Sequence, residues 1–154
     1  PDRRAEAARS FLARNAAALT AGERERIAGE TLAILDEPQF AALFAPGSRA
    51  EAPIVGRIAP PGCEPRTVSG QVDRLAVSAE QVLIADYKTN RPAPRRLAEI
   101  PPGYIAQLAL YRAVLAKLYP DRPVRAALVF TDAPRLLELP AEALTAALAH
   151  LTSA

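Results

Sequence analysis

The sequence predicts an α/β (α+β) fold in which a central mixed β-sheet is flanked by helices. Two observations support this class. Apolar residues recur at helical spacing up to about residue 45, whereas runs typical of strands begin at residue 51. These runs form a meander of three strands, which a long helix separates from a further strand. A sheet with this order of elements is expected to carry its helices on its faces.

The first elements are predicted to be helices. Residues 3–18 are rich in alanine and place apolar residues at helical spacing. Thr20 and Glu23 have the spacing of a capping box, which starts a second helix that runs to about residue 36. A short third helix is expected over 38–44, because proline suits the first turn of a helix.

The sheet is expected to begin with an edge strand, because Pro53 cannot donate a hydrogen bond to a neighbouring strand. Small polar residues at 78–81 predict the turn of a β-hairpin. A loop rich in proline and arginine then leads to the long helix. The expected strands are 51–59, 66–77, 81–88, 124–132 and 135–140, and the expected later helices are 103–118 and 141–151.

Length and composition predict one domain over residues 1–154, with a helical part at 1–45 and a core at 50–154. No apolar run approaches the length of a membrane span, and the net charge of +2 is too small to indicate nucleic acid by itself. The one cysteine, Cys63, excludes an iron–sulfur cluster with four cysteines from this chain and agrees with a cytoplasmic setting. The absence of methionine predicts that the chain is part of a longer protein.

The predicted hairpin brings two carboxylates together. If the turn at 78–81 has an even number of residues, Val77 lies opposite Val82 and paired positions sum to 159. Asp73 then lies opposite Asp86, with Cβ atoms about 4.5–5.5 Å apart. Two such carboxylates about 4 Å apart repel by about 4 kcal/mol at an effective dielectric constant of 20.

Four explanations of this pair are open. The carboxyl groups can share a proton, pair with Lys88 or Arg74, bind a hard cation, or lie on a solvated face. Lys88 shares their side of the strand because strands alternate with period two. The apolar run before Asp86 is typical of a strand buried on both faces, which favours the cation.

These motifs resemble a known family. "GQVDRL", a hairpin, "IADYKTN" and a helix with "QLALY" are similar to the PD-(D/E)XK nuclease superfamily over about residues 51–131. More narrowly, they resemble the C-terminal nuclease domain of AddAB/RecBCD-type (AddA-like) helicase–nucleases, which process double-strand breaks. The resemblance implies a restriction-endonuclease-like core and a Mg²⁺- or Mn²⁺-dependent deoxyribonuclease of the exonuclease type.

The resemblance also implies roles for individual residues. Asp73 and Asp86 would bind the metal, with the backbone carbonyl of Tyr87 completing its shell. Lys88 would activate the attacking water and stabilise the charge that grows on the phosphate. Glu51 matches the acidic residue of the first strand, which would serve as an outer or second metal ligand.

Gln107 and Tyr111 match the family's Gln-x-x-x-Tyr pair. They lie four positions apart in the long helix and so share one face, from which they could hold phosphate or orient Lys88. The alternative is a core tyrosine beside a boundary glutamine. The loop rich in proline and arginine that follows residue 88 is the best candidate for contact with the DNA backbone, through Arg91, Arg95 and Arg96. An ordinary solvated loop explains these arginines equally well.

One family feature is absent. The Gly-x-x-x-His motif of an early helix has no counterpart, and the single histidine, His150, is expected near the end of the closing helix. The chain alone is therefore expected to bind metal weakly or to be inactive. A catalytically incomplete module for DNA binding or subunit docking is the main alternative, and a stand-alone restriction-type endonuclease is a third.

The resemblance further implies partners and a location. The expected partners are single strands from an unwound duplex end, a helicase portion of the same protein and a second helicase–nuclease subunit. The expected location is the bacterial cytoplasm, in association with the nucleoid, without a membrane partner.

Overall fold

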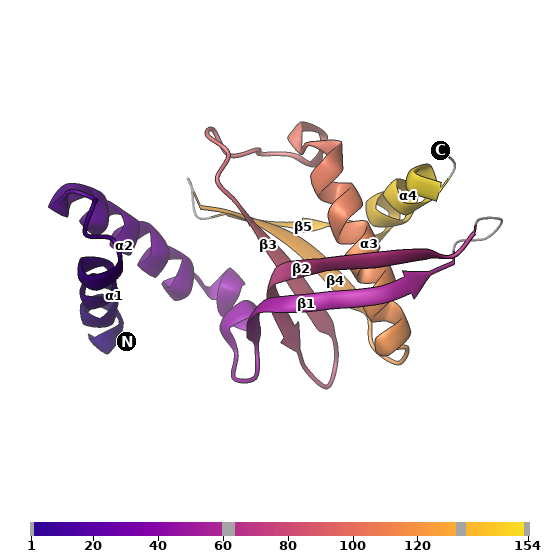
Figure 1. Cartoon of the computed structure of the whole chain (residues 1–154), viewed down its shortest axis with the longest axis horizontal. Helices are drawn as coiled ribbons and strands as arrows, with labels where there is room; N and C mark the ends of the chain where they lie inside the picture. The colour runs from indigo at the N-terminus through magenta and orange to yellow at the C-terminus, as the bar shows by residue number, and fades with distance from the viewer. Residues whose placement is uncertain (1, 60–63, 132–134, 153–154) are drawn as a thin grey trace.

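The computed structural model describes residues 2–59, 64–131 and 135–152, so Cys63 and the loop over 60–63 lie outside the described residues. Its sheet has five strands in the order β1-β2-β3-β4-β5. The sheet is mixed and is flanked by helices, as the sequence predicts (Figure 1). The strands are β1 (Arg49–Ile58), β2 (Arg66–Val77), β3 (Val82–Lys88), β4 (Val124–Phe130) and β5 (Arg135–Leu139).

The strand connections explain why the sheet is mixed. β1, β2 and β3 form an antiparallel meander, and β4 lies parallel to β3 because the long helix α3 (Pro102–Leu118) carries the chain across the sheet. β5 then pairs with β4 in the antiparallel direction. β1 is an edge strand, which confirms the prediction from Pro53.

Two helical segments precede the sheet, α1 (Asp2–Asn15) and α2 (Ala21–Asp36). The capping box of α2 is confirmed: the Thr20 hydroxyl accepts a hydrogen bond from the Glu23 amide at 3.2 Å, and the Thr20 amide donates to the Glu23 carboxylate at 2.8 Å. Figure 1 shows these two helices side by side and projecting away from the sheet.

The remaining helices connect or cover the strands. η1 (Pro38–Phe44) is a 3₁₀ helix that starts at the predicted proline and joins α2 to the sheet. η2 (Leu97–Glu99) precedes α3, and α4 (Ala141–Thr152) ends the described chain and packs on α3. None of the helices in the described ranges combines the length and hydropathy needed to cross a bilayer.

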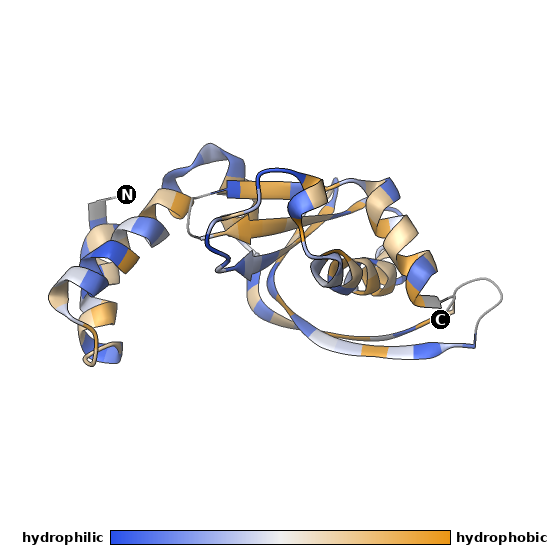
Figure 2. Ribbon diagram, turned by 90° about the horizontal axis from the view of Figure 1, so that it is seen from above, coloured by the Kyte–Doolittle hydropathy of each residue, from blue (hydrophilic) through white to orange (hydrophobic). Residues whose placement is uncertain are grey.

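Alternating side chains of the central strands form two apolar layers. Val82 and Ile84 of β3 belong to the layer under α3, whereas Leu83 and Ala85 belong to the layer under η1. β3 is therefore buried on both faces from residue 82 to residue 86, as the sequence predicts. Figure 2 shows the most hydrophobic strands in the interior and hydrophilic residues along α1 and α2.

The register of the predicted hairpin is confirmed. Val77 pairs with Val82 and Arg74 with Ala85, so the paired positions sum to 159. The ladder stops at that second pair, one position before the two aspartates would form a main-chain pair. β2 pairs with β1 between residues 66 and 75, whereas it separates from β3 before Arg74.

Candidate active site

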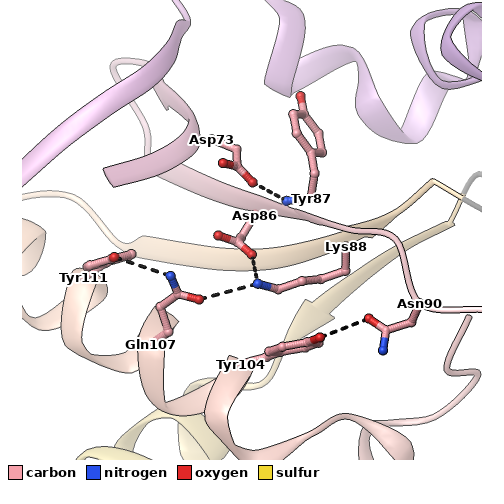
Figure 3. Close-up of polar contacts among 8 residues, drawn as sticks. All are labelled: Asp73, Asp86, Tyr87, Lys88, Asn90, Tyr104, Gln107 and Tyr111. Atoms are coloured by element: carbon pink, nitrogen blue, oxygen red, sulfur yellow. Dashed lines mark hydrogen bonds and ion pairs between the residues drawn. The ribbon is translucent and has the colours of Figure 1, made fainter. Parts of the chain in front are cut away.

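Two acidic side chains occupy the point where β2 and β3 separate. Asp86 ends the buried run of β3 and is only 5% exposed. Asp73 is half-buried, and its Oδ2 accepts a 2.6 Å hydrogen bond from the backbone amide of Tyr87. This bond takes the place of a main-chain pair between the strands. In Figure 3 the second oxygen of each carboxylate points to the same side, away from Tyr87 and Lys88.

The charge on Asp86 is only partly compensated. Burial raises the pKa of the Asp86 carboxyl, and the negative charge of Asp73 raises this pKa further. The Lys88 ammonium opposes both effects through an ion pair with Oδ2 of Asp86. That buried oxygen receives no hydrogen bond of normal geometry in the described part of the chain. An additional positive charge beside the two carboxylates would therefore be stabilised.

Lys88 is held from three sides (Figure 3). Besides the Asp86 ion pair, its Nζ lies 3.5 Å from Oε1 of Gln107 and 4.1 Å from the centroid of the Tyr104 ring. The Tyr104 hydroxyl donates a 3.2 Å hydrogen bond to Oδ1 of Asn90. These contacts fix the half-buried ammonium at the end of β3 and connect it with the loop that follows.

The predicted pair on α3 lies together and next to Lys88. Nε2 of Gln107 donates to the Tyr111 hydroxyl at 3.4 Å, and Oε1 of the same amide faces Lys88. The Tyr111 hydroxyl lies against Gly70 of β2, where an added Cβ would be 2.1 Å from it. The glycine therefore leaves room for the Tyr111 hydroxyl against the strand.

Tyr104, Asn90 and Gly70 are site residues that the sequence reasoning missed. Tyr104 lies three positions before Gln107 on the same helix, so the helical spacing that groups Gln107 with Tyr111 could have found it. Asn90 and Gly70 lie within the quoted motifs "IADYKTN" and "GQVDRL", but their contacts join segments far apart in the sequence, so the motifs alone do not assign their partners.

Glu51 lies at the same end of the sheet but has a separate partner. The pairs on either side of it place Glu51 opposite Asp73. Glu51 is exposed and accepts a 2.6 Å hydrogen bond from Gln71. Its φ of 51° lies in the left-handed region, which is costly for a residue with a Cβ.

The acidic residues also affect Tyr87. Burial is the main cause of the raised pKa of the Tyr87 hydroxyl, and the charges of Asp73 and Glu51 add to it.

The three arginines of the predicted DNA contact are all exposed in the loop after β3. Arg96 is paired with Glu99, with 2.9 Å between Nε and Oε1. The same carboxylate accepts a hydrogen bond from the Arg95 backbone amide at 2.8 Å. The bond between Asn90 and Tyr104 ties the start of this loop to the site.

The donor set fits a hard cation that keeps some of its water. Mg²⁺ is typically bound through one or two carboxylates and retains several water molecules. Asp73 and Asp86 supply two carboxylates, and the oxygens that do not face Tyr87 or Lys88 point to the same side (Figure 3). In the described ranges, no group of three or more His, Cys, Asp or Glu residues is arranged to hold a metal ion. A cation here would thus depend on the two aspartates, water and backbone oxygens.

A mixed sheet that presents two aspartates and a lysine where two adjacent strands separate agrees with a nuclease-like class of protein. A comparison with protein families agrees: the model of the PD-(D/E)XK nuclease superfamily matches residues 2–152. The chain therefore belongs to this superfamily, whose members are nucleases that generally use divalent metal ions.

Comparisons with individual proteins add little to this assignment. No curated protein matches the chain. Among solved structures, the crystal structure of SSO0001 is similar at 17% identity with a TM-score of 0.41. The match covers 81% of this chain and 57% of the other, so the chain spans little more than half of that protein.

Proposed function

We propose that the chain is the nuclease domain of a helicase–nuclease and hydrolyses phosphodiester bonds of DNA during double-strand break repair. The observation that carries the proposal is the placement of Asp73, Asp86 and Lys88 at the point where β2 and β3 separate. Membership of the superfamily supports a nuclease, and the helicase and the repair role are proposed from the resemblance of the motifs.

The proposed chemistry follows from the charges at the site. Asp73 and Asp86 would hold Mg²⁺ or Mn²⁺, which when bound supplies positive charge and lowers the pKa of a coordinated water. Lys88 would place a compact positive charge beside the phosphate, where the negative charge increases during attack. Gln107 and Tyr104 keep the ammonium in position, so little reorganisation is needed when substrate binds.

The proposed substrate is a single strand released by the motor at an unwound duplex end, and the proposed mode is exonucleolytic. The exposed arginine loop after β3 supports contact with its phosphates through Arg91, Arg95 and Arg96, and Glu99 already compensates part of the charge of Arg96. We also propose a second helicase–nuclease subunit as partner and a bacterial cytoplasmic location near the nucleoid.

A second candidate is a nuclease-like module that binds DNA or a subunit without cleavage. The observation in its favour is the small ligand set: His150 lies in the last turn of α4 and lines the groove between α3 and α4, not the aspartate pair. In this case the aspartates would remain, but metal would bind too weakly to support hydrolysis.

Substitution in the complete helicase–nuclease tests the proposed chemistry. Asp86→Ala and Lys88→Ala should each abolish DNA degradation and leave ATP-driven unwinding intact, because they remove the metal ligand and the charge beside the phosphate. Lys117→Ala is the matched control, since Lys117 is the other lysine and bonds the Arg57 carbonyl outside the site. Degradation that survives both site substitutions would show that the chemistry is assigned wrongly.

A further inference from the structure

A cavity of about 470 Å³ adjoins the candidate active site between β2 and α3. Gln107 and Tyr111 belong both to its wall and to the group of residues around Lys88. At its far end Arg66 donates a 3.0 Å hydrogen bond to the Leu151 carbonyl of α4. Figure 1 shows β2 extending past β3 toward the side where α4 lies. The cavity is therefore a continuation of the site along β2.

One wall of the cavity is an open strand edge. β2 pairs with β1 from residue 66 onward, but it pairs with β3 only over 74–77. Within the described chain, residues 66–72 thus have a strand neighbour on one side only. An unpaired edge presents backbone N–H and C=O groups that can bond a ligand. Four residues of this stretch line the cavity, namely Arg66, Thr67, Val68 and Ser69.

The lining combines apolar surface with hydrogen-bonding groups. Ile58, Val68 and Leu110 provide apolar contact, while the Gln107 amide and the Tyr111 hydroxyl provide polar groups at the end nearest Lys88. A nucleobase has this combination, with two apolar faces and a polar edge. The volume also lies in the usual range for small-molecule sites. Phosphate alone would fit poorly, because Arg66 is the one charged residue among the described residues of this lining and already bonds a carbonyl.

We propose that this cavity receives the base of one nucleotide of a single strand, whose adjoining phosphate lies against Lys88 and Asp86. The proposal rests on the proposed nuclease function and names where the strand lies. Gln107 separates the two positions, because one end of its amide faces Lys88 and the other faces Tyr111 at the cavity wall. A duplex would not place an unpaired base here, so the cavity selects single strands.

Binding of short fluorescent single-stranded oligodeoxynucleotides, measured by anisotropy with Ca²⁺ in place of Mg²⁺, tests the subsite. Ala106→Phe on α3 should lower the affinity about tenfold, because it fills the place of one base. Ala143→Phe is the matched control: Ala143 is also a half-buried helical alanine, but it lines only the neighbouring groove between α3 and α4. It should bind like the unchanged chain.

Oligonucleotides with one abasic site, moved along the strand, test the same subsite without any substitution in the protein. The unchanged chain should lose affinity when the abasic site is at one particular position, and Ala106→Phe should abolish this position dependence. Equal affinity at all abasic positions, or no binding of single strands, would overturn the subsite. If that result comes with Mg²⁺-dependent cleavage that Lys88→Ala removes, the proposed function stands and only the subsite fails.

Discussion

At the scale of single residues, the buried carboxylate of Asp86 is disfavoured as an anion even though it forms an ion pair with Lys88. Burial and Asp73 both raise its pKa, and one lysine opposes them. A structural surface pair would not need such an arrangement, since exposed ion pairs carry little energy and little strain. Asp86 is thus a buried carboxylate whose charge Lys88 compensates only in part.

A pH series of unfolding measurements tests this view of Asp86 without any enzyme assay. A carboxyl whose pKa is raised on folding binds more protons in the folded state, so its contribution to stability is present at low pH and lost as the pH rises through the raised pKa. Asparagine does not titrate. In urea unfolding with EDTA, Asp86→Asn should therefore gain stability relative to the native chain as the pH rises above about 3.8.

Glu138→Gln provides a control of opposite sign. The hydrogen bond from Arg125 lowers the pKa of Glu138, so its contribution is present at higher pH and lost as the pH falls. The native chain should therefore lose its advantage over this variant on acidification. If the difference between Asp86→Asn and the native chain stays constant over the pH range, the raised pKa of Asp86 is wrong.

Two substitutions of Tyr104 separate its ring from its hydroxyl. Tyr104→Leu removes the aromatic face beside the Lys88 ammonium and should lower kcat about tenfold, since such contacts contribute about 1–2 kcal/mol when partly desolvated. Tyr104→Phe keeps the ring but loses the bond to Asn90, which ties the arginine loop after β3 to the site. It should therefore raise KM and change kcat little. Equal effects of the two variants on kcat would contradict a role of the ring in positioning Lys88.

At the scale of elements, the contact between β2 and α3 fixes the second half of the site. Gly70→Ala should push the Tyr111 ring away from β2, because the new methyl group would lie 2.1 Å from its hydroxyl. We expect a loss of about 1–3 kcal/mol in the free energy of unfolding, as for other overpacked sites. We also expect loss of metal-dependent activity, because Gln107 would lose its partner.

Gly29→Ala in α2 is the control for this substitution. An added Cβ at Gly29 meets no atom within 4 Å, and alanine in a helix is favoured by about 0.5–1 kcal/mol over glycine. It should raise stability slightly and leave activity unchanged. Unchanged activity in Gly70→Ala would show that the approach of Tyr111 to β2 is dispensable.

The elements also show what could be predicted from the sequence. The turn at 78–81 has an even length, and this alone gave the register in which paired residues sum to 159. The burial of β3 followed from its uninterrupted apolar run. The docking of α3 over β3 could not be predicted, because helical spacing identifies a face but not the strand it covers. Helical spacing places Tyr104 on the face of Gln107, but its contact with Lys88 depends on this docking. The left-handed backbone of Glu51 could not be predicted either, because no local residue pattern requires it.

At the scale of the whole molecule, the two apolar layers explain why the site can be both charged and rigid. Phe40 and Leu43 of η1 cover one face of β3 and β4, and α3 covers the other. β3 is thereby clamped up to Asp86, where the apolar run ends and polar side chains from β2, β3 and α3 meet (Figure 3). The fold thus places its charges where the central strand leaves the core.

Calorimetric titration of the chain with Mn²⁺ tests the central claim that Asp73 and Asp86 jointly bind a divalent cation. The account predicts saturable binding heat that disappears in Asp73→Asn. The heat should persist in Asp36→Asn, because Asp36 is an exposed aspartate at the end of α2 that pairs with Arg4 of α1, away from the site. The same heat in Asp73→Asn as in the native chain, or no saturable heat in the native chain, would contradict it.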